Sequence, residues 1–172
     1  MTTEIFKIIV RFILLLGSQI LIVQNINLTG YLIPLPYVLF LLSLPFETNK
    51  IIVLLLGFFT GIVMDHFYDA SGLHASACTL MGFSRYYVLK YISPRDGYDV
   101  AVKPTIEDMG NEWYLRYAGT LVLIHHFALF NLELFRLSSI FSNLARILLS
   151  SAITLVFIYL IQYIFFRKKE RA

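Results

Sequence analysis

Long apolar stretches separated by short polar segments run through the whole chain. Most of them approach the roughly 20 residues that a helix needs to cross the hydrocarbon core of a bilayer. Because such unbroken runs lack the alternation of barrel strands, they predict helices. We therefore predict an all-α polytopic membrane protein, a single integral membrane domain over residues 1–172 built as a six-transmembrane-helix bundle. Its spans are expected at about residues 5–23, 31–46, 51–68, 72–91, 114–134 and 144–166.

The second apolar stretch differs from the others because it is short and contains Pro34, Pro36 and Pro45. Proline removes a backbone donor and kinks a helix. We expect an irregular or broken helix whose freed carbonyls are covered by neighbouring helices. Short spans interrupted by proline line binding sites in some transporters. The simpler interpretation, which we favour, is a kinked packing helix that starts at about Leu35.

Composition supports a membrane protein. The chain is 58% hydrophobic and has a mean hydropathy of +0.73, which is more apolar surface than a soluble domain of this size can cover. The lone Cys78 excludes an intramolecular disulfide and is expected to be a small packing residue. Polar residues 24–27 follow the first apolar run where a signal peptide would have small residues. We therefore expect that run to be retained as a helix.

The distribution of basic residues predicts the orientation. With the N-terminus inside, 12 of the 14 Lys and Arg residues fall on the inner side, and only Arg136 and Arg146 fall on the outer side. The positive-inside rule requires such a bias. We predict that both termini are cytoplasmic, and that Arg11 and Arg85 extend from their spans to the inner interface.

The longest connection is expected on the cytoplasmic side, at residues 92–113. It is polar and contains Pro94, Gly97, Pro104 and Gly110 as helix breakers. Loops of this length are often functional, so it is either a docking surface or a solvated linker of mixed charge. The basic C-terminal stretch 167–171 is expected to anchor the chain at anionic membrane lipid.

Three residues spaced four apart, Gly57, Gly61 and Asp65, share one face of the third span. The two glycines allow close approach of another helix, and a carboxylate near hydrocarbon needs a partner, water or a function. Asp65 either lines an outward-facing pocket or pairs with a cation, or it is a solvated helix-end residue. An Asp65–Arg146 ion pair is our hypothesis. The alternative for Arg146 is extension to lipid phosphate.

Small residues also line the fourth span, from Gly72 through Thr79 to Gly82, and predict tight packing on the third. His125 and His126 lie in the middle of the fifth span. A zinc site would need further ligands at helical spacing, and none is nearby in sequence. We interpret one of these histidines as a hydrogen-bonding residue between helices, and we predict no metal and no cofactor.

Catalytic motifs give little support for an enzyme. The sequence contains no Gly-x-Ser-x-Gly, no His-Glu-x-x-His and no glycine-rich phosphate loop. One enzymatic alternative remains, an intramembrane aspartyl hydrolase in which Asp65 and Asp69 share a proton. It is disfavoured because residues four apart on one helix form a poor catalytic pair. The scattered basic residues do not predict nucleic-acid binding.

The run from Gly57 to Ala75, read as Gly57-Phe58-x-x-Gly61-x-x-x-Asp65 followed by Gly72-Leu73-His74-Ala75, resembles the signature region of the bacterial rod shape-determining MreD family. The resemblance implies a non-enzymatic scaffold of the cell elongation machinery in the cytoplasmic membrane, contributing to cell shape and peptidoglycan synthesis. The implied partners are an MreC-like bitopic protein, MreB, RodA and a class B penicillin-binding protein, and a homodimer is left open.

The same resemblance supplies the alternative function. The family fold is similar to the S component of energy-coupling-factor transporters, which implies a small-molecule uptake component with a pocket near Asp65. Within the scaffold interpretation, the expected partner-binding or helix-packing residues are Gly57, Gly61, Asp65 and Gly72.

Overall fold

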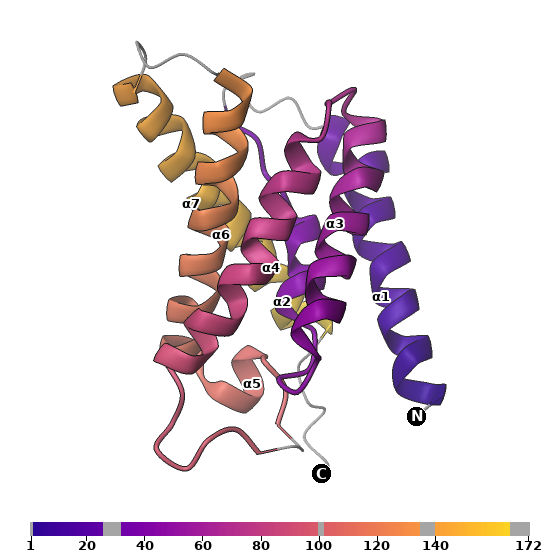
Figure 1. The fold of residues 1–172 in the computed structure, drawn as a ribbon, viewed down its shortest axis with the longest axis vertical. Coiled ribbons are helices and arrows are strands. Elements are labelled where there is room, and N and C mark those ends of the chain that lie inside the picture. Colours follow the sequence, from indigo (N-terminus) through magenta and orange to yellow (C-terminus); the bar gives the residue numbers. More distant parts are fainter. Residues whose placement is uncertain (1, 26–31, 100–101, 135–139, 166–172) are drawn as a thin grey trace.

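The computed structural model describes residues 2–25, 32–99, 102–134 and 140–165, and this part of the chain is helical, without strands (Figure 1). This confirms the all-α prediction. Among the described residues, five helices are long, and four short helical segments lie among them. In chain order the elements are α1 (Thr2–Leu21), η1 (Val23–Asn25), η2 (Pro36–Val38), α2 (Leu39–Leu42), α3 (Lys50–Phe67), α4 (Leu73–Tyr91), α5 (Ile106–Met109), α6 (Asn111–Leu134) and α7 (Ile140–Phe165).

Among the described residues, three helical stretches are long and apolar enough to cross a membrane by length and composition. They are Phe6–Asn25, Lys50–Phe67 and Asn143–Ile164. Helices α4 and α6, with 19 and 24 residues, are also long, but they carry more polar side chains. Many of those side chains point into the bundle rather than outward, as described below.

The helices pack in the order α3–α4, α4–α6 and α6–α7, and α1 packs against η1 and the η2–α2 segment. Helices α3 and α4 form an antiparallel hairpin (Figure 1). The η2–α2 segment lies in the core, and every residue from Pro34 to Leu44 is buried. The structure therefore confirms that the proline-containing stretch is irregular. We call residues 32–44 the broken segment.

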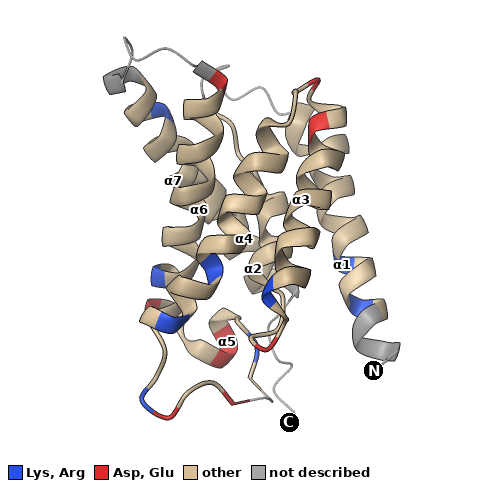
Figure 2. Ribbon diagram, in the orientation of Figure 1, with Lys and Arg blue, Asp and Glu red and all other residues tan. Residues whose placement is uncertain are grey.

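The two ends of the bundle differ in charge. Most Lys and Arg residues gather at the end where α1, α3 and α6 begin and where α4 ends, although α5 and the loop before it also carry carboxylates there (Figure 2). Carboxylates mark the turn between α3 and α4 at the opposite end, and one basic residue of α7 lies toward that end (Figure 2). We call these the basic end and the far end. Helix α1 finishes at the far end and α3 starts at the basic end, so the broken segment carries the chain back through the bundle (Figure 1).

Part of the connection between α4 and α6 packs against the basic end. Tyr98 stacks on Phe46 with ring centroids 4.1 Å apart, and its hydroxyl donates to the Leu89 carbonyl at 3.0 Å. Partial burial raises the pKa of the Tyr98 phenol, which keeps this donor protonated. Thr105 caps the short helix α5 by accepting from the Asp108 amide. The described loop is thus packed around Tyr98 and Thr105, whereas residues 93–97 are exposed.

Candidate functional site

The glycines of the third span create close contact inside the chain. A Cβ on Gly57 would lie 2.8 Å from the carbonyl oxygen of Cys78, and a Cβ on Gly61 would overlap the backbone of Ala75. Both obstacles belong to the backbone of α4, which cannot rotate away. Gly57 and Gly61 therefore act in helix packing between α3 and α4, where only a hydrogen side chain fits.

Asp65 binds the first turn of α4. Its Oδ1 accepts from the His74 amide at 2.8 Å, and its Oδ2 accepts from the Ala75 amide at 3.0 Å. The first amides of a helix have no partners within the helix and attract negative charge. The N-cap position of α4 is Gly72, which has no side chain to provide this bond. Asp65 supplies the missing cap from the preceding helix.

The turn between α3 and α4 needs unusual backbone angles. Gly72 has φ +86° and Asp69 has φ +50°, both in the left-handed region. Glycine enters this region without strain, and aspartate tolerates it better than most residues do. The role of Gly72 is therefore conformational: it redirects the chain so that α4 starts against Asp65.

The hypothesis of an Asp65–Arg146 ion pair is wrong for this structure. Both oxygens of Asp65 accept backbone amides of α4. Arg146 instead pairs with Glu133 at 2.9 Å, and its guanidinium lies 4.2 Å from the centre of the Phe130 ring. Capping satisfies the buried carboxylate without a cation, because two amide donors at a helix start provide positive potential.

Arg85 is the second group whose placement differs from the expectation. It is only 3% exposed and does not extend to the interface. Its Nε donates to the Tyr117 hydroxyl at 2.8 Å, and its Nη2 donates to the carbonyls of Leu44 and Pro45 at 2.5 and 3.3 Å. These carbonyls follow α2, where the helix has no further amides to offer. Arg85 therefore donates to carbonyls that have no amide donor where α2 ends.

Two further side chains bind carbonyls at the same place. The Tyr117 hydroxyl donates to the Leu42 carbonyl at 3.0 Å, and Arg11 donates from Nη1 to the Ser43 carbonyl at 3.1 Å. Each of these side chains comes from a different long helix. The C-terminal side of the broken segment is thus bound to α1, α4 and α6 at once.

The N-terminal side of the broken segment is bound in the same way. The Leu35 amide donates to the Thr154 hydroxyl at 3.0 Å, and the Ile33 amide donates to the Ser150 hydroxyl at 3.2 Å. Gln19 of α1 donates to the Pro34 carbonyl at 3.2 Å. As expected from the prolines, neighbouring helices replace the hydrogen bonds that a regular helix would make.

Tyr37, His74, Cys78 and His125 form a buried polar cluster inside the bundle. The Tyr37 hydroxyl is 2.9 Å from His74 Nδ1, 3.0 Å from His125 Nε2 and 3.5 Å from Cys78 Sγ. These groups come from the broken segment, α4 and α6. Cys78 and His125 are completely buried, which excludes solvent and substrate from the pair in this conformation.

His126, the neighbour of His125 on α6, also makes buried hydrogen bonds. Its Nδ1 contacts the Val122 carbonyl at 2.9 Å, and its Nε2 is 3.1 Å from the Thr154 hydroxyl of α7. Since a carbonyl only accepts, Nδ1 carries the proton and Nε2 accepts from Thr154. This confirms a hydrogen-bonding histidine between helices. No group of three or more metal-ligating His, Cys, Asp or Glu side chains exists among the described residues.

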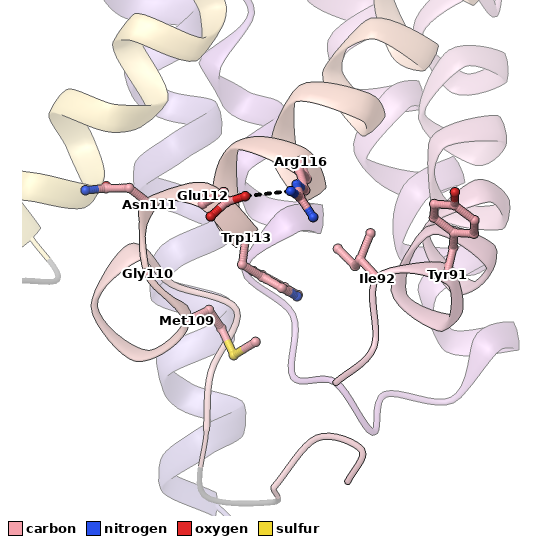
Figure 3. A pocket seen from close by; sticks show the side chains of 8 residues that line it. All are labelled: Tyr91, Ile92, Met109, Gly110, Asn111, Glu112, Trp113 and Arg116. Atoms are coloured by element: carbon pink, nitrogen blue, oxygen red, sulfur yellow. Dashed lines mark hydrogen bonds and ion pairs between the residues drawn. The ribbon is translucent and has the colours of Figure 1, made fainter. Parts of the chain in front are cut away.

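A cavity of about 730 Å³ opens at the basic end between α4 and the start of α6 (Figure 3). Trp113 projects into it, with Met109 and Ile92 on either side (Figure 3). Arg116 and Glu112 form an exposed ion pair at its edge. The cavity combines apolar walls with charged groups and is formed largely by the loop that the sequence singled out.

Comparison of the chain with family models, with curated proteins and with solved structures found no match. The functional argument therefore depends on the geometry above and on the motif between Gly57 and Ala75. The sequence did not indicate the roles of Gln19 or Tyr37, because a lone polar residue in an apolar run does not identify its partner. Pro34 and Pro36 were the available signal, since they require side chains that satisfy the broken backbone.

Proposed function

We propose that the chain is a non-enzymatic membrane scaffold of the bacterial cell elongation machinery, resembling MreD and binding an MreC-like bitopic partner. The observation that carries the proposal is the α3–α4 hairpin. Gly57 and Gly61 permit the close contact, Asp65 caps α4, and Gly72 makes the turn. The residues that carry the resemblance therefore form one structural unit, as expected of a family defined by its fold rather than by an active site.

The charge distribution supports placement in the cytoplasmic membrane. Lys and Arg mark one end of the bundle (Figure 2), and the positive-inside rule assigns such an end to the cytoplasm. Five long helices and the broken segment would give six passes, with both termini cytoplasmic. The helix exteriors are apolar, with large exposed side chains such as Leu55, Phe58 and Phe59 on α3. Lipid or partner helices would cover these faces.

The interior supports a scaffold better than an uptake component. Asp65 and His74, which lie at the far end where an S component would admit its ligand, are 7% and 5% exposed. Both carboxylate oxygens and His74 Nδ1 are bonded within the chain. The same bonds disfavour the aspartyl hydrolase, since Asp65 is engaged in capping rather than placed beside a second carboxylate.

Depletion in the native bacterium, followed by affinity purification of a tagged copy, tests the proposal. We expect rod-shaped cells to become round, and the tagged chain to co-purify a single-span protein with a periplasmic coiled coil. A tagged membrane protein of similar size from the same cells is the control for nonspecific capture. Unchanged cell shape together with co-purification of an ATPase module and a retained small ligand would contradict the scaffold and favour uptake.

A further inference from the structure

A lateral groove of about 610 Å³ runs between α1 and α7. Pro36 and Leu39 of the broken segment form its floor, Leu14 lies on the α1 wall, and Phe157 and Ile161 form the α7 wall. The groove exists because the broken segment is too short and irregular to fill the space between these two helices. We call it the α1–α7 groove.

Charge is confined to one end of the α1–α7 groove. Lys7 and Arg11 line it, and because they are four residues apart they share one face of α1. Beyond them the described lining is apolar except for Ser18, whose hydroxyl donates to the Leu15 carbonyl at 2.9 Å. The lining thus carries its charge at one end and is apolar beyond it, a pattern that suits a ligand with one anionic end and a long apolar remainder.

The groove follows the α1 span from the basic end. The span Phe6–Asn25 starts at that end, so at 1.5 Å per residue Lys7 and Arg11 lie within about 8 Å of its start, in the leaflet that faces the basic end. The apolar lining continues along α1 from Leu14 to Val23, past the middle of the span. An acyl chain that entered from this leaflet would extend along the groove toward the bilayer midplane.

The volume of the groove, about 610 Å³, lies within the range of about 300–1,000 Å³ usual for small-molecule sites. A single flexible chain is therefore a suitable occupant.

We propose that the α1–α7 groove binds an anionic phospholipid of the cytoplasmic leaflet, with one acyl chain along the groove and the phosphate between Lys7 and Arg11. The bond from Arg11 Nη1 to the Ser43 carbonyl holds the guanidinium at the basic end of the groove. A guanidinium has five donors, so arginine binds a carbonyl and a phosphate together. The cytoplasmic leaflet is rich in anionic lipid.

Native mass spectrometry of the full-length chain, delipidated in detergent and then titrated with lipid, tests this inference. The probes are phosphatidylglycerol and phosphatidylcholine with identical acyl chains. We expect one phosphatidylglycerol molecule to be retained in preference to phosphatidylcholine. Lys7→Gln should weaken this binding about fivefold, the usual effect of one cation at an anionic surface. Ser18→Phe, which fills the middle of the groove, should weaken binding of both lipids.

Lys90→Gln is the matched control, because Lys90 is an exposed cation at the basic end outside the groove. Arg11→Gln is interpreted only together with Lys7→Gln, since Arg11 also binds the Ser43 carbonyl. Equal retention of the two lipids, or equal effects of Lys7→Gln and Lys90→Gln, would overturn the anionic site. Retention unaffected by Ser18→Phe would overturn the groove as its location, and a bound protein helix displaced by Ser18→Phe would replace lipid as the occupant.

Discussion

At the scale of single residues, Asp65 is the most informative side chain, because its carboxylate replaces the cap that Gly72 cannot provide. Asp65→Asn leaves one acceptor oxygen for two amides and removes the charge that favours a helix start. We expect a loss of about 1–2 kcal/mol in stability, as for other N-caps. Thermal unfolding of the purified protein in detergent measures it.

Asp69→Asn is the matched control for this change. It has the same chemistry four residues further along, at an exposed position, and asparagine also tolerates the positive φ of Asp69. Its melting temperature should stay near that of the parent. A similar loss in both variants would show that charge in this turn, rather than capping of α4, stabilises the hairpin.

At the scale of elements, the α3–α4 contact depends on the absence of a side chain at Gly61. Gly61→Ala places a methyl group against the backbone of Ala75, so the two helices must move apart. Overpacking typically costs about 1–3 kcal/mol, and a rigid backbone obstacle places this variant at the upper end. Gly17→Ala in α1, where no atom lies within 4 Å of the new methyl group, should be neutral or slightly stabilising. Equal melting temperatures for the two variants would contradict the close contact.

The broken segment makes a second prediction at this scale. Arg85→Lys keeps the charge but loses the planar group that reaches Tyr117 and two carbonyls together. One buried acceptor left without a donor costs about 1–3 kcal/mol, which should lower the melting temperature by several degrees. Arg116→Lys, at a side chain that is 66% exposed, should change little. An unchanged Arg85→Lys variant would show that Arg85 is not needed to satisfy these carbonyls.

These elements also show where inference from the sequence ends. Apolar length and proline placement predicted the helices and the irregular segment, because both follow from local backbone chemistry. Small residues predicted the α3–α4 packing because their spacing places them on one face of each helix. The partners of Asp65 were missed because its carboxylate oxygens accept from backbone amides. Every residue except proline has such an amide, so the pattern of charged side chains does not show which amides a carboxylate will bind. Arg85 was misplaced because the carbonyls that hold it are 40 and 41 residues away in the chain.

At the scale of the whole molecule, orientation in the membrane is the property on which the proposed function depends. Cys78 is completely buried and should not react with a maleimide, so an introduced cysteine reports on its own position. Ser71→Cys lies in the exposed turn at the far end, and Asp96→Cys lies in the exposed loop at the basic end. In intact cells, a membrane-impermeant maleimide should label Ser71→Cys, whereas Asp96→Cys should react only after permeabilisation. Labelling in the opposite order would place the basic end outside, against the positive-inside rule, and would remove the cytoplasmic leaflet as the source of lipid for the α1–α7 groove.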